Sequence, residues 1–131
     1  MTWPVQHITQ SIDAPMAAVS AVAGDPRRLP EWAAGLSSGI RDQHGRWFTD
    51  SPMGAVEVAF VGPVEHGILD HDVTLPDGTV FHNPLRVLAN GDGSEVVFSL
   101  FRLPGVSDAD YAADAETIRG DLLRLKGLLE G

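Results

Sequence analysis

The chain has 131 residues and no cysteine, and its 18 acidic and 9 basic side chains give a formal net charge of −9. The acidic balance disfavours nucleic-acid backbones and anionic membranes as partners, because both are bound through basic surfaces. The lack of cysteine excludes disulfides, thiol catalysis and Cys-ligated metal centres, and no apolar run reaches the roughly 20 residues of a membrane span. We therefore expect a single domain over residues 1–131, located in the cytoplasm.

The N-terminal part predicts one strand and two short helices. Residues 3–12 mix β-branched and polar side chains as strands do. Residues 13–15 (Asp-Ala-Pro) then predict a helix over 15–23, with Asp13 accepting from free amides and Gly24 as the C-terminal cap. Asp25 and Pro26 repeat the start signal for a second short helix, which Pro30 limits.

Residues 35–101 contain short runs separated by turn sequences, a pattern typical of β-hairpins. Short runs at 46–49, 55–61, 67–75, 79–89 and 94–101 are separated by turn sequences such as 76–78 (Pro-Asp-Gly) and 90–93 (Asn-Gly-Asp-Gly). Connections this short leave no room for parallel crossovers, so we expect an antiparallel meander.

A long amphipathic helix is predicted at the C-terminus. Residues 107–110 (Ser-Asp-Ala-Asp) resemble a capping box, and about 24 helical residues follow. One apolar stripe runs along this helix at spacings of four and three: Tyr111, Ala115, Ile118, Leu122, Leu125 and Leu129.

These elements predict an α+β protein in which a curved antiparallel sheet of about seven strands wraps around the C-terminal helix. A long helix can cover the concave face of such a sheet, and a sheet that curls without filling the space beneath it leaves a hollow. Two short helices after the first strand complete this architecture.

Two motifs resemble the SRPBCC or START-type helix-grip superfamily, which includes birch-pollen-allergen-like proteins and polyketide cyclases. They are residues 8–15 (Ile-Thr-Gln-Ser-Ile-Asp-Ala-Pro) and residues 25–32 (Asp-Pro-Arg-Arg-Leu-Pro-Glu-Trp). Ser20 departs from the pattern, since Trp or Phe is common there. The resemblance covers nearly the whole chain and implies the fold with a lipid, polyketide, hormone or aromatic metabolite as ligand, but it does not imply an activity.

Strand alternation predicts which side chains face the hollow. A three-residue loop at 76–78 pairs His71 with Asn83, and the next loop places Leu85 opposite Phe98. The expected apolar wall consists of Leu69, Val73, Phe81, Leu85, Val87, Phe98 and Leu100, with Ile118, Leu122 and, at the rim, Tyr111 from the helix.

His71 and Asn83 are polar groups on this wall. They could anchor a ligand carbonyl or hydroxyl, with His71 as a general acid or base, or they could hydrogen-bond internally or to a water. Gln10 points inward if Ile8 and Ile12 are core residues, although glutamine is mostly exposed. Arg46 is interpreted as a surface residue that covers an aromatic ring.

The remaining histidines raise a metal hypothesis that the pattern does not support. His66, Asp72 and His82 lie close together along adjacent strands, but Asp72 and His82 share the outer face while His71 lies on the other. We therefore expect no metal and no cofactor.

Two functions compete, with a weaker third. The favoured one is non-enzymatic binding of a small hydrophobic molecule between sheet and helix. The alternative is a polyketide cyclase or dehydrase in which His71 moves a proton. The third is an interaction module in which Val97 and Phe101 bury against a second copy.

Overall fold

Two antiparallel sheets lie side by side and one long helix crosses them, in a computed structural model that describes residues 1–131. The first sheet has the order β1 (Val5–Ile12), β8 (Gly93–Phe101), β7 (Leu85–Asn90). The second has the order β2 (Arg41–Gln43), β3 (Arg46–Ser51), β4 (Gly54–Phe60), β5 (His71–Thr74), β6 (Val80–Asn83). The helices are α1 (Met16–Ala23), α2 (Asp108–Glu130) and three 3₁₀ segments, η1 (Pro26–Glu31), η2 (Ala34–Leu36) and η3 (Val64–His66).

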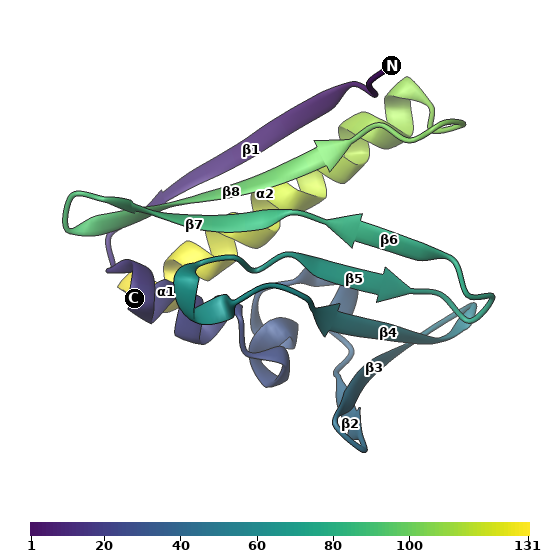
Figure 1. The fold of residues 1–131 in the computed structure, drawn as a ribbon, viewed down its shortest axis with the longest axis horizontal. Coiled ribbons are helices and arrows are strands. Elements are labelled where there is room, and N and C mark those ends of the chain that lie inside the picture. The colour runs from purple at the N-terminus through teal and green to yellow at the C-terminus, as the bar shows by residue number, and fades with distance from the viewer.

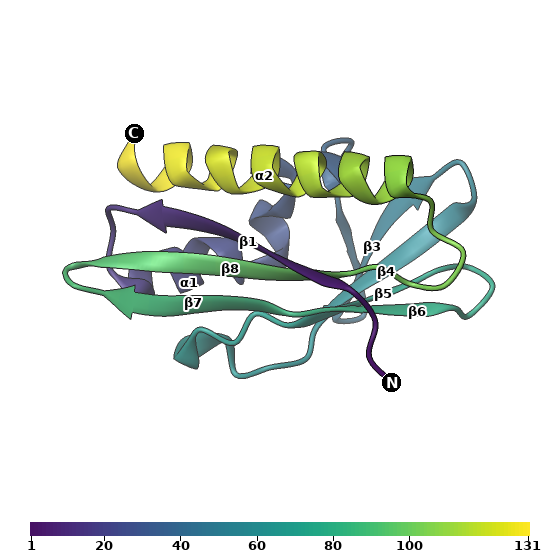
Figure 2. The ribbon, with the colours of Figure 1, turned by 90° about the horizontal axis from the view of Figure 1, so that it is seen from above.

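The α+β architecture is confirmed, with a strand count that differs from the expected seven. Figure 2 shows α2 as a separate layer that runs along one face of β1 and β8. The buried residues of α2 are Ala115, Leu122 and Leu125, three members of the predicted stripe. Ser107 caps the helix by accepting from the Asp110 amide at 3.1 Å. No helix is both long enough and apolar enough to span a membrane.

Pro84 divides the expected strand over 79–89 into β6 and β7, which lie nearly in line (Figure 1). The predicted register holds on both sides of the break, with His71 opposite Asn83 and Leu85 opposite Phe98. Pro84 turns its backbone toward β8, where its carbonyl accepts from the Ser99 amide at 3.1 Å. Because proline has no N–H to return a bond, the pairing with β8 ends there and β6 diverges from it.

Strand β2 is an element that the sequence pattern did not predict. It joins β3 through a two-residue turn in which His44 and Gly45 have φ angles of 56° and 83°. Two successive positive φ angles are typical of a type I′ hairpin turn. The pattern was missed because histidine, unlike asparagine, is not a usual residue at the first of these positions.

The region after β1 corrects two predictions. Asp13 does not cap α1, because Pro15 occupies the N-cap position and no side chain accepts from the first turn. The Asp13 amide instead donates to the Glu130 carboxylate at the end of α2, at 2.7 Å. The second expected helix is the 3₁₀ segment η1, with Pro30 inside it; Asp25 does cap it, accepting from the Arg27 amide at 3.0 Å.

Candidate functional site

A hollow of about 260 Å³ lies between the second sheet, α2 and the η1–η2 segment. Of the 17 residues that line it, 12 are hydrophobic, and the lining contains no lysine or arginine. We call this hollow the inner cavity. Six of the residues expected on the concave wall border it: His71, Val73, Leu85, Phe98, Ile118 and Leu122.

Other residues of the expected wall line a second, more open hollow of about 730 Å³. It lies where β6 and β8 diverge beyond Pro84, and we call it the outer groove. Its lining includes Val73, Phe81, Asn83, Leu100 and Tyr111. Asn83 thus pairs with His71 in the ladder but borders a different hollow.

The last two expected wall residues, Leu69 and Val87, border neither hollow. Their exposed fractions are 0% and 2%, and they belong to the packed core beside the cavity. The Tyr111 hydroxyl donates to the Leu100 carbonyl at 2.9 Å, which fixes its ring at the edge of the groove.

Part of the cavity wall was not identified from the sequence. Leu29 reaches the cavity from η1, Leu36 from η2 and Trp32 from the segment between them. Val56, Val58 and Phe60 reach it from β4. Their alternation along one strand was the available signal for that side of the wall.

The η1–η2 segment is tied to α2 by Asp121 and Arg124. Asp121 accepts from the Ala34 amide at 3.0 Å and from the Arg124 guanidinium, whose Nε also donates to the Trp32 carbonyl at 3.1 Å. Burial raises the pKa of the Asp121 carboxyl, against the opposing effect of these two donors. The contacts hold the Trp32 side of the wall against the helix.

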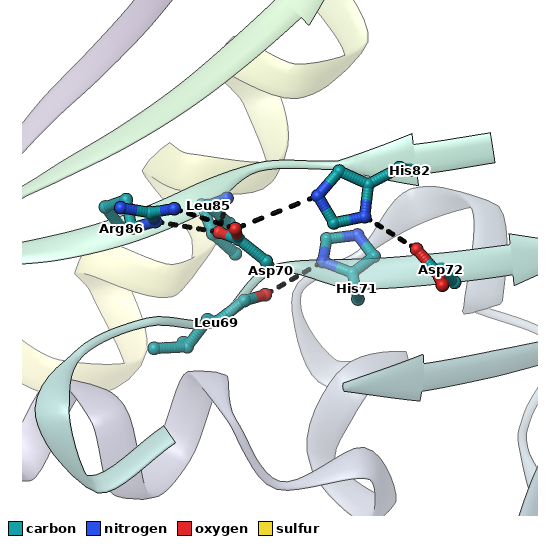
Figure 3. Close-up of polar contacts among 7 residues, drawn as sticks. All are labelled: Leu69, Asp70, His71, Asp72, His82, Leu85 and Arg86. Carbon is teal, nitrogen blue, oxygen red and sulfur yellow. Dashed lines mark hydrogen bonds and ion pairs between the residues drawn. The ribbon is translucent and has the colours of Figure 1, made fainter. Parts of the chain in front are cut away.

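His71 is the polar residue on the cavity wall with a free hydrogen-bonding atom. Its Nδ1 lies 3.0 Å from the Leu69 carbonyl (Figure 3), and because a carbonyl only accepts, Nδ1 carries the hydrogen. Burial lowers the pKa of His71, so the ring is neutral at neutral pH and Nε2 bears a lone pair. Nε2 makes no hydrogen bond within the protein, and the ring packs edge-on against Phe60 and Phe98 at 5.7 and 6.3 Å between centroids.

Asp70 explains why the Leu69 carbonyl is available to His71. In a regular antiparallel ladder the Leu85 amide would return a bond to that carbonyl, since the Leu69 amide donates to the Leu85 carbonyl at 2.8 Å. Here the Leu85 amide donates to the buried Asp70 carboxylate instead, at 3.0 Å (Figure 3). Arg86 holds that carboxylate with two bonds of 2.9 Å and keeps its pKa low.

The other histidine of this hairpin, His82, pairs with carboxylates on the outer face. His82 Nδ1 lies 2.6 Å from an Asp72 carboxylate oxygen and its Nε2 lies 3.8 Å from Asp70, as Figure 3 shows. Asp72 and His82 pair across the hairpin as predicted. No three histidine, aspartate or glutamate side chains are grouped so as to hold a metal ion.

The remaining candidate residues lie away from the cavity. The Gln10 amide donates to the Ser11 carbonyl at 2.9 Å. Arg46 pairs with Glu57 and covers the Phe48 ring at 5.3 Å, so its surface interpretation is confirmed. Phe101 is 41% exposed and borders the outer groove, while Val97 is half-buried.

No protein-family model matches the chain, and no curated protein matches it in sequence. Solved structures share its fold. An Aha1 dimer from Colwellia psychrerythraea has a TM-score of 0.74 at 14% identity, over 97% of this chain and 96% of that one.

Two further structures support the same comparison. A START superfamily protein from Mycobacterium smegmatis has a TM-score of 0.66 at 15% identity, over 96% of this chain and 97% of that one. Ara h 8.0201 has a TM-score of 0.66 at 13% identity, with the same two coverages of 96% and 97%. The chain therefore has the START-type helix-grip fold that its two N-terminal motifs indicated.

Proposed function

We propose that the protein binds a small hydrophobic molecule in the inner cavity. The observation that carries the proposal is the cavity itself, an apolar space of about 260 Å³. Protein interiors contain few voids larger than a water molecule. A hollow of this size with mostly apolar walls offers surface against which a small apolar molecule can be buried.

A cavity-filling substitution tests the proposal. Ile118→Trp places an indole in the hollow, while Leu123→Trp adds the same ring at an α2 position that is 57% exposed. Naphthalene should raise the melting temperature of the wild type and of Leu123→Trp, because a ligand that binds only the folded state stabilises it. Ile118→Trp should fold and lose this response.

Native mass spectrometry of the protein purified from its own host adds an independent readout. We expect a reproducible small-molecule adduct that is released on denaturation. An empty spectrum together with unchanged melting temperatures in naphthalene would contradict the proposal.

The free Nε2 of His71 favours one alternative, a cyclase or dehydrase in which this nitrogen takes a proton from a bound substrate and returns it to the product. A His71→Phe variant that binds the substrate but no longer converts it would support that alternative. Association with a second copy through Phe101 is the weaker alternative, and sedimentation velocity tests it.

A further inference from the structure

The polar atoms of the inner cavity differ in what they can still bind. The Thr49 hydroxyl donates to the Gly39 carbonyl at 2.7 Å, and the Ser51 hydroxyl donates to the Gly54 carbonyl at 2.9 Å. The Trp32 indole nitrogen has no acceptor, but it is closed off by neighbouring atoms. The side chains of the wall therefore offer a ligand no free hydrogen-bond donor at neutral pH.

His71 offers a free hydrogen-bond acceptor, because its Nε2 has no partner within the protein. The Leu69 carbonyl fixes the hydrogen on Nδ1, so the lone pair is on Nε2. Unlike the Trp32 indole nitrogen, Nε2 is not closed off by neighbouring atoms, so a donor from outside the protein can reach it. An occupant of the cavity with a donor group would supply this hydrogen bond in place of water.

The charge of the lining limits the occupant further. Asp121 is the ionisable residue on the wall besides His71, and it already accepts from the Ala34 amide and Arg124. A carboxylate or phosphate inside would lose its hydration, face Asp121 and find no lysine or arginine. The occupant is therefore uncharged.

The volume of the inner cavity limits the size of the occupant. An engineered apolar cavity of about 150 Å³ holds benzene, and pockets for drug-sized ligands begin near about 300 Å³. A cavity of about 260 Å³ lies between these limits and suits one or two rings. The rings of Phe60, Phe98 and Trp32 supply aromatic contacts for such a ligand.

We infer that the cavity selects a neutral aromatic molecule of one or two rings that carries a hydroxyl group, and that this hydroxyl donates to Nε2 of His71. The inference rests on the proposed function, since it specifies the ligand of the same cavity. It makes His71 the residue that distinguishes a hydroxyl from an ether or a hydrocarbon on one ring system, while Asp121 and the lack of lysine and arginine in the lining exclude a carboxylate.

Four probes with one ring system separate these features by calorimetric titration. They are 2-naphthol, 2-methoxynaphthalene, naphthalene and 2-naphthoate. We expect 2-naphthol to bind about tenfold more tightly than the ether and the hydrocarbon, which corresponds to about 1.4 kcal/mol. We expect 2-naphthoate not to bind. The ¹⁵N resonance of Nε2 should move with 2-naphthol and stay in place with naphthalene.

His71→Phe should abolish the tenfold preference while naphthalene still binds, and His82→Phe on the outer face should keep it. Equal binding of the three neutral probes, or preferred binding of 2-naphthoate, would overturn this inference and leave the proposed function standing. If no probe binds up to its solubility limit, both fail. The wild-type probe series decides the question even if His71→Phe does not fold.

Discussion

Replacing Leu122 with alanine should cost less stability than replacing Leu125, although both side chains are fully buried, at 1% and 0% exposure. Each substitution removes three carbon groups, which at about 0.8 kcal/mol each amounts to about 2.4 kcal/mol of transfer free energy. The cavity left behind raises the total for such changes to between about 2.7 and 5.0 kcal/mol.

The two positions differ in what surrounds them. Leu122 borders the inner cavity, so the space left by its truncation would join that hollow, whereas Leu125 is not among the residues that line it and its truncation would leave a separate void in the core. We therefore expect a loss of about 3 kcal/mol for Leu122→Ala and about 4 to 5 kcal/mol for Leu125→Ala. The first corresponds to a fall in melting temperature of about 10 °C for a domain of this size.

Urea unfolding followed by far-UV circular dichroism measures both losses, and a titration with anthracene measures the space gained. Leu122→Ala should admit this three-ring probe, while Leu125→Ala should not. Equal losses in stability, with neither variant binding the larger probe, would mean that the hollow beside Leu122 is not space a ligand can use.

Three further predictions concern the polar groups. Because burial lowers the pKa of His71 from 6.5, the unfolded chain takes up a proton below about pH 6.5 that the folded chain does not, so stability should fall from pH 7 towards pH 5. His71→Phe should flatten this part of the urea-midpoint profile, and an unchanged profile would show that the ring titrates normally. Asp70→Asn should lower the free energy of unfolding by about 1 to 2 kcal/mol, because the side chain's bonds to the half-exposed Arg86 lose their charge. Asp72→Asn, on the solvated face, should change the free energy of unfolding by no more than about 0.5 kcal/mol. Ser107→Ala should cost about 1 kcal/mol and speed amide exchange in the first turn of α2; unaltered exchange there would rule out the cap.

Local sequence signals predicted the elements that depend on neighbours along the chain. The stripe and the Ser107 cap identified α2 because both repeat within a few residues. The loop at residues 76–78 set the register that places His71 opposite Asn83, because loop length and side-chain alternation fix pairing in a hairpin. The same alternation assigned His71 to the inner face.

Features that depend on distant partners were missed or incomplete. The sequence shows that Pro84 interrupts the hydrogen bonding of a strand, but not which neighbouring strand loses its partner. That neighbour is β8, and the divergence of β6 from β8 separates the outer groove from the inner cavity. The position of Trp32 on the cavity wall depends on the contact of its segment with Arg124 and Asp121, about ninety residues later in the sequence.

His71 shows where the two kinds of information meet. The sequence by itself determined that this residue lies on a β-strand, faces inward and sits on an apolar wall, because period-two alternation and a short loop are local properties. Only the tertiary structure decided that its ring is neutral and that Nε2 is free. The Asp70 carboxylate takes the Leu85 amide, which leaves the Leu69 carbonyl to His71, and the surrounding core lowers its pKa. Desolvation and competition for a single carbonyl arise only when separate segments pack together.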